Sequence, residues 1–78
     1  MSLKRFQTDL EKARIRKIDI TKIIDGLKLL QRKGIAERDM EIIVKNIINN
    51  PEYRADFIRD PIGVAGGFAP PYVPVTPK

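Results

Sequence analysis

The chain has 78 residues, of which 15 are Lys or Arg and 10 are Asp or Glu, and its formal net charge is +5. A chain of this length forms one domain at most, and about 60 residues bury only about 60% of their unfolded surface, so intrinsic stability should be modest. The sequence contains no Cys and no His. Thiol nucleophiles, disulfides, thiolate zinc sites and the usual neutral-pH proton shuttle are therefore excluded, and we expect neither an enzyme nor a bound cofactor.

The positive charge is concentrated in the first half of the chain. Residues 1–33 hold ten bases and four acids, whereas residues 34–60 hold four bases and six acids. No stretch reaches the roughly 18 apolar residues of a membrane span, and the N-terminus lacks the apolar segment of a secretory signal. We therefore expect a cytoplasmic protein without a membrane span.

Apolar residues recur at helical spacing in two stretches of the first half. Those at positions 3, 6, 10 and 13 predict a helix over about 3–17. Those at positions 20, 23, 24, 27 and 30 predict a second helix. Asp19 or Thr21 is available as the N-cap of this second helix, because both side chains carry an acceptor oxygen.

Two glycines mark the course of the second helix. Gly34 follows a basic pair and is a typical C-terminal stop, so the helix should end at Lys33. Gly26 lies inside the helix and costs about 1 kcal/mol relative to Ala, which burial of the apolar face must offset. A third helix over about 37–49 follows, with acidic residues in its first turn that suit the positive end of the helix dipole.

The strongest local signal is a helix start at Asn50. Asn is a good N-cap and Pro51 fits the first helical position, while the Asp-Pro pair ten residues later ends the segment. These signals predict a short helix over about 51–59. Tyr53 and Phe57 lie one turn apart on one face of it.

The composition changes completely at Pro61. Five of the six Pro and three of the five Gly lie in residues 61–78, so we expect neither helix nor compact core there. Residues 61–67 should form a flexible Gly-rich linker, and residues 68–78 should favour an extended polyproline II ridge. The predicted fold is all-α: three or four short helices form a small bundle over residues 1–60, and an extended Pro-rich tail follows.

Gly66 and Gly67 stand between the helical region and the tail. Two consecutive glycines let a backbone thread a narrow protease cleft, although a plain flexible linker has the same composition. Residues 50–61, together with the Gly-Val-Ala-Gly-Gly of residues 63–67, resemble the end of the leader in ribosomally synthesised and post-translationally modified peptide precursors. In particular they are similar to nitrile-hydratase-like and nitrogen-fixation-type leaders. The resemblance covers residues 42–67 at most.

The resemblance implies that residues 1–67 are a leader bound by a modifying enzyme. It also implies that a processing peptidase, a cysteine peptidase of the transporter-linked type, cuts after Gly67, with export of the tail product left open. The leader is basic where such leaders are often acidic, and the tail has neither Cys nor Ser. Thiazole and lanthionine chemistry thus has almost no substrate, and the candidate modified residues are Phe68, Tyr72, Thr76 and Lys78.

In this interpretation the fourth helix carries the partner-binding side chains Tyr53, Phe57 and Ile58. An aromatic pair on one helix face is a large apolar anchor for an enzyme's docking groove. The alternative is that these aromatic rings close the core of the chain itself.

Two other classes of function remain open. The Pro-x-x-Pro spacing of the tail suits an arm that reaches neighbouring subunits of a larger assembly, in which this chain is a structural or interaction subunit. The basic first half suggests a nucleic-acid-binding module, although acids interrupt it, no aromatic is interleaved, and a solvated helix face explains the charges as well. Its candidate phosphate contacts are Lys12, Arg14, Arg16, Lys17, Lys22, Lys28, Arg32 and Lys33.

Overall fold

The computed structural model describes residues 3–65, which form helices and connecting turns and contain no strand. The helices are α1 (Lys4–Lys12), α2 (Lys17–Arg32), α3 (Glu37–Asn49), α4 (Pro51–Arg59) and α5 (Pro61–Ala65). The predicted all-α fold is confirmed, with one more helix than expected.

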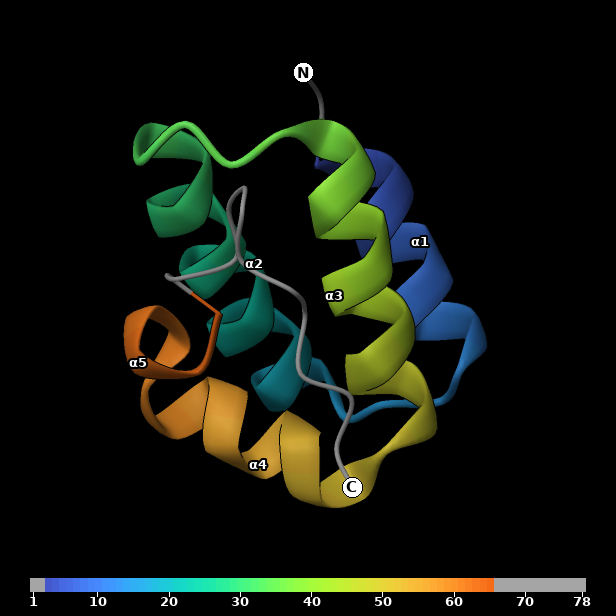
Figure 1. Ribbon diagram of the computed structural model, residues 1–78. Coiled ribbons are helices and arrows are strands. Elements are labelled where there is room, and N and C mark those ends of the chain that lie inside the picture. The colour runs from blue at the N-terminus through green and yellow to red at the C-terminus, as the bar shows by residue number, and fades with distance from the viewer. Residues whose placement is uncertain (1–2, 66–78) are drawn as a thin grey trace.

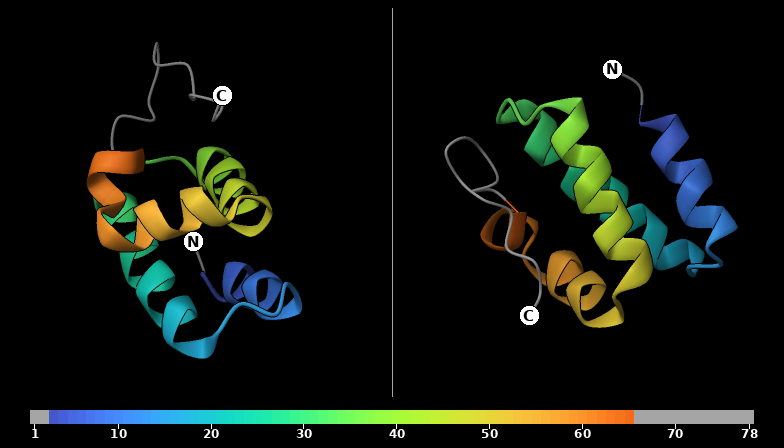
Figure 2. Two further views of the ribbon diagram at one scale, coloured as in Figure 1. Left: turned by 90° about the horizontal axis from the view of Figure 1, so that it is seen from below. Right: turned by 45° about the vertical axis from the view of Figure 1, so that its right-hand side comes forward.

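The first three helices run up and down beside one another, and the last two close the bundle (Figure 1). α1 and α3 run in the same direction, and α2 runs opposite to both. α4 crosses the end of the bundle where α2 begins and α3 ends, and α5 then turns back along α2 (Figure 2). α2 contacts α1, α4 and α5, which makes it the central element of the fold.

Apolar side chains from all five helices and from two of the turns form one core. No polar or charged side chain among residues 3–65 is buried. The stability of the fold therefore depends on apolar burial rather than on buried polar networks. The core residues are Phe6, Leu10, Ile15, Ile20, Ile23, Leu27, Leu30, Ile35, Met40, Ile43, Val44, Ile47, Phe57 and Ala65.

The turn between α2 and α3 is a Schellman motif. The backbone N–H of Ile35 donates to the carbonyl oxygen of Leu30 at 3.1 Å, and that of Gly34 donates to Gln31 at 3.0 Å. Gly34 has φ +90°, a left-handed conformation that glycine adopts without a Cβ penalty. The predicted stop at Gly34 is confirmed, and Ile35 enters the core directly after it.

The same motif ends α1, but without a glycine. Ile15 donates to the carbonyl oxygen of Leu10 at 3.3 Å, and Arg14 donates to Glu11 at 3.0 Å. Arg14 takes φ +63°, so a non-glycine residue occupies the left-handed position. The prediction of one helix over 3–17 is therefore wrong beyond position 12, because the chain reverses here to bring Ile15 into the core.

α2 begins earlier than predicted, and no side chain caps its N-terminus. Arg16 occupies the N-cap position in an extended conformation, and Lys17 is the first helical residue. Asp19 instead forms an ion pair with Arg16, with 3.3 Å between Nε and Oδ2. The Thr21 hydroxyl donates to the carbonyl oxygen of Lys17 at 3.2 Å. Neither predicted N-cap residue therefore serves as one.

The start of α4 agrees with the prediction. Asn50 is the N-cap, and its Oδ1 accepts hydrogen bonds from the backbone N–H groups of Glu52 and Tyr53 at 3.0 and 3.1 Å. Pro51 occupies the first helical position, where its missing N–H costs nothing. Local sequence signals alone therefore determine how this helix begins.

Arg54 joins α4 to the end of α3. Its Nε and Nη2 donate to the carbonyl oxygens of Ile47 and Ile48 at 3.0 and 3.1 Å. The last carbonyl groups of a helix have no hydrogen-bond partner inside the helix, and a guanidinium placed here satisfies two of them. Its positive charge also interacts favourably with the negative end of the helix dipole. This contact fixes the sharp corner between the two helices.

Arg5 joins α1 to the other end of α3, where that helix begins. Its guanidinium lies 3.1 Å from Glu37 and also hydrogen-bonds to Glu41. The hydrogen bond to Glu41 raises the pKa of Arg5 above its already high ordinary value, so the side chain stays charged. The guanidinium also lies 5.1 Å from the ring centroid of Phe6. These exposed contacts orient α1 rather than supply much stability.

The expectation of no helix after Pro61 is wrong for Pro61–Ala65. Asp60 accepts the backbone N–H of Gly63 on Oδ1 at 3.0 Å and that of Val64 on its carbonyl at 3.0 Å, which begins α5. Ala65 is only 2% exposed and belongs to the core. The predicted flexible linker therefore does not begin at Pro61, and the compact part of the chain extends at least to Ala65.

Candidate functional site

The predicted partner-binding residues of α4 face the chain's own core. Phe57 is fully buried, and a Cβ atom added to Gly26 of α2 would lie 2.8 Å from its ring and 2.9 Å from Cβ of Pro61. Tyr53 and Ile58 are half-buried and pack against the same core. The structure thus gives Phe57 the alternative role considered from the sequence, and its ring offers no surface to a partner.

The predicted cleavage and modification residues lie outside the described residues. They are Gly66, Gly67, Phe68, Tyr72, Thr76 and Lys78. The structure does show what precedes them: Ala65 of α5, the last described residue, packs in the core. The packed helical region therefore extends to the position directly before Gly66.

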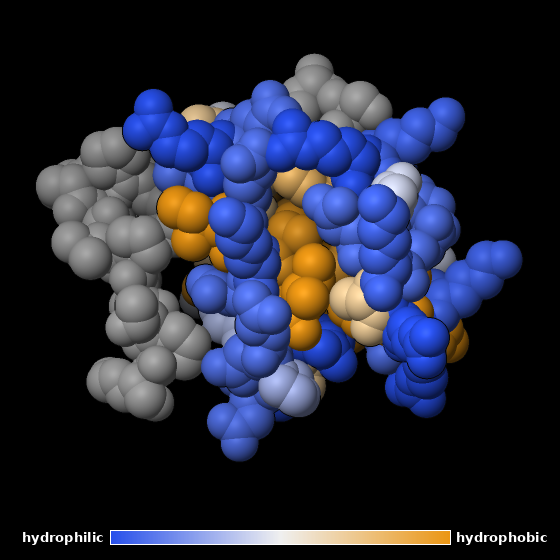
Figure 3. Space-filling model, turned by 90° about the vertical axis from the view of Figure 1, so that its right-hand side faces the viewer, coloured by the Kyte–Doolittle hydropathy of each residue, from blue (hydrophilic) through white to orange (hydrophobic). Residues whose placement is uncertain are grey.

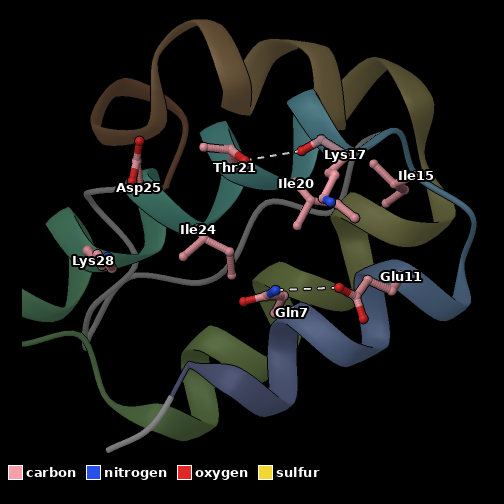
Figure 4. Close-up of a pocket in the computed structure, with 9 residues that line it drawn as sticks. All are labelled: Gln7, Glu11, Ile15, Lys17, Ile20, Thr21, Ile24, Asp25 and Lys28. Carbon is pink, nitrogen blue, oxygen red and sulfur yellow. Dashed lines mark hydrogen bonds between the residues drawn. The ribbon is translucent and has the colours of Figure 1, made fainter.

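A groove of about 440 Å³ lies between α1 and α2 (Figure 4). Its apolar side chains are Ile15, Ile20 and Ile24, of which Ile15 and Ile20 are buried and Ile24 is half-buried. Figure 3 shows another face of the molecule, on the side of α1 and α3, where apolar surface also lies between hydrophilic ridges. The groove was not predicted, because the periodicity of each helix does not show how far apart two helices pack.

The rim of the groove is polar and carries both signs of charge. On α1, Gln7 Nε2 donates to Glu11 Oε2 at 3.4 Å; on α2, Asp25 and Lys28 stand at the edge. Among residues 3–65, no group of His, Cys, Asp or Glu could hold a metal ion. The groove therefore combines an apolar floor with a rim of mixed charge.

Four basic residues gather at the turn between α1 and α2. Lys12 ends α1, Arg14 and Arg16 lie in the turn, and Lys17 begins α2; all four are exposed. The sequence placed these residues in one long basic stretch, but the reversal at Arg14 was not predicted. The fold concentrates them at one corner of the molecule.

Comparison with protein-family models, with curated proteins and with solved structures finds no significant match to the chain. None of the helices within residues 3–65 combines the length and apolar character needed to span a membrane. The functional assignment therefore depends on the chain's own residues.

Proposed function

We propose that the chain is a precursor peptide, in which a folded helical domain binds a modifying enzyme and residues 68–78 are modified and released after Gly67. The observation that supports this most is the position of Ala65. Ala65 lies in α5 and packs in the core, and the two glycines follow it directly in the sequence. A folded recognition domain thus precedes a short tail of different composition.

The burial of Phe57 changes how such a domain would be recognised. A leader that binds as an isolated helix would expose its aromatic residues to the enzyme, whereas here Phe57 is fully buried and its ring packs against Gly26 of α2. We therefore propose that the enzyme binds the assembled bundle, with the partly exposed Tyr53 and Ile58 at the contact.

Mass spectrometry of the chain from its native source tests the proposal. We expect a fragment beginning at Phe68, with mass changes on Phe68, Tyr72, Thr76 or Lys78. Gly67→Val places a branched side chain next to the scissile bond and should abolish the fragment. Val73→Thr, a nearly isosteric change six residues further on, is the control and should leave release unchanged. An intact, unmodified chain in the native source would rule the proposal out.

The groove between α1 and α2 favours a second candidate, an interaction subunit of a larger assembly. An apolar depression with polar edges can receive an apolar segment of a neighbouring subunit. This candidate predicts that the native chain co-purifies with a larger complex and that deleting residues 68–78 dissociates it, as size-exclusion chromatography with light scattering would show. Release of the tail without any complex would favour the precursor instead.

A further inference from the structure

Arg14 and Gly34 occupy equivalent positions at the two ends of α2. Each follows the C-cap of a helix, takes a positive φ, and precedes an isoleucine that enters the core. A side chain at such a position strains the backbone, and glycine does not. The chain uses the unstrained residue at Gly34 but keeps an arginine at Arg14. Strain retained in an exposed residue points to a use for its side chain.

The charges of the neighbouring side chains indicate which kind of ligand Arg14 would contact. Lys12, Arg14 and Lys17 form no ion pair with a carboxylate among residues 3–65, while Arg16 is paired with Asp19. Glu11, the acid adjoining the turn on α1, accepts a hydrogen bond from Gln7 and faces the groove. The turn therefore presents three uncompensated cations within six positions.

α2 carries further exposed cations beyond the turn. Lys22 and Lys28 are exposed, with Asp25 as the acid between them. From Lys17 to Lys28 the helix advances by 11 residues, or about 16 Å at 1.5 Å per residue. That length spans about five base pairs of duplex DNA at 3.4 Å per pair. Lys17 and Lys28 lie on one side of α2, where both line the groove, whereas Lys22 lies on another side. Lys17 and Lys28 therefore extend the positive charge of the turn along the helix.

We propose that this surface binds the phosphate backbone of a nucleic acid. We call it the basic surface; it consists of Lys12, Arg14, Arg16, Lys17 and Lys28. Within the described residues, Ile18 is the one large apolar side chain that is exposed next to this turn, and it is 60% exposed. One such side chain is too little apolar area for membrane insertion, whereas a row of cations suits a regularly charged polymer. Binding is independent of base sequence, since cations alone contact phosphates.

Fluorescence anisotropy with the full chain and a fluorescein-labelled 20-base-pair DNA duplex tests this assignment. The affinity should fall steeply between 50 and 200 mM NaCl, because each phosphate contact releases a counterion. Arg14→Gly should weaken binding about fivefold to tenfold at 100 mM salt and reduce the salt slope by about 1. The same substitution should raise the thermal midpoint by about 4 °C, since it removes the strain. Loss of binding would then coincide with a gain in stability.

Two control variants distinguish binding by the basic surface from a general effect of the net positive charge. Lys45→Gln removes one positive charge from the exposed face of α3 and should change the affinity less than twofold. Arg14→Lys keeps the charge and should keep most of the affinity. Absence of binding at 50 mM salt, an unchanged affinity of Arg14→Gly, or an equal loss in Lys45→Gln would each overturn the proposal. Binding to phosphatidylserine vesicles without binding to the duplex would also overturn it.

Discussion

A Cβ atom added to Gly26 would lie 2.8 Å from Cε2 of Phe57, so the ring of Phe57 packs directly on the backbone of α2. Pro61 covers the same glycine, at 2.9 Å from the added atom. Glycine inside a helix is unfavourable by about 1 kcal/mol, but here it is the residue that allows α4 and α5 to approach α2.

Gly26→Ala should therefore destabilise the protein although it improves helix propensity. Overpacking against two rigid rings costs about 1–3 kcal/mol, and the gain in propensity offsets only about 1 kcal/mol of it. We expect a lower midpoint in thermal unfolding followed by circular dichroism. Phe57→Leu serves as the test of mechanism: the double variant should lose less stability than the sum of the single variants. A Gly26→Ala protein as stable as the parent would contradict the packing described.

Arg54→Gln should remove the guanidinium that caps α3. Two half-buried hydrogen bonds to backbone carbonyls are lost, and we expect a cost of about 1–2 kcal/mol in urea unfolding. Arg59→Gln is the matched control on the same helix, because Arg59 forms only an exposed ion pair with Asp56 at 2.7 Å. Its cost should stay within about 0.5 kcal/mol. Equal losses in the two variants would show that Arg54 acts through charge alone.

Asn50→Ala should expose two backbone N–H groups at the start of α4. The loss of an N-cap costs about 1 kcal/mol, and chemical denaturation measures it directly. Asn50→Asp retains the acceptor oxygen and adds a negative charge at the positive end of the helix dipole, so it should be at least as stable as the parent. A destabilised Asp variant would contradict the capping role.

Gly63→Ala should loosen α5 without unfolding the rest of the protein. The added Cβ would lie 2.1 Å from Oδ2 of Asp60, so the carboxylate that accepts the Gly63 N–H must move away. We expect faster amide hydrogen exchange over residues 61–65 and unchanged exchange in α2 and α3. Asp60→Ala loses the same acceptor without the clash and should reproduce the pattern. Protection equal to that of the parent in both variants would show that burial of Ala65 alone holds α5.

Elements with a local signal were predicted closely, and elements held by distant contacts were not. Asn50 and Gly34 gave the start of α4 and the end of α2, because capping depends on neighbouring residues. The reversal at Arg14 has no glycine to mark it, so the first helix was predicted five residues too long. α5 begins at a proline and contains a glycine, and it is helical because Asp60 accepts hydrogen bonds at its start and Ala65 packs in the core.

The candidate site shows the same division. The basic residues of the first half were named from composition, but their concentration at one corner depends on the turn at Arg14. Phe57 was identified as an apolar anchor, yet its contact with Gly26 joins residues that are 31 positions apart. This contact results from the packing of α4 across α2, and a local sequence pattern does not predict how two distant helices pack.

The turns at Arg14 and Gly34, each with one residue in the left-handed conformation, also bear on the order in which the chain folds. Each is closed by hydrogen bonds that span at most six residues, from Leu10 to Ile15 and from Leu30 to Ile35. Short loops have little closure entropy to overcome, so α1, α2 and α3 can align before any remote contact forms. The seating of Phe57 on Gly26 requires that alignment and should come later. We therefore expect substitutions at the turns to slow folding, and substitutions at Phe57 to speed unfolding.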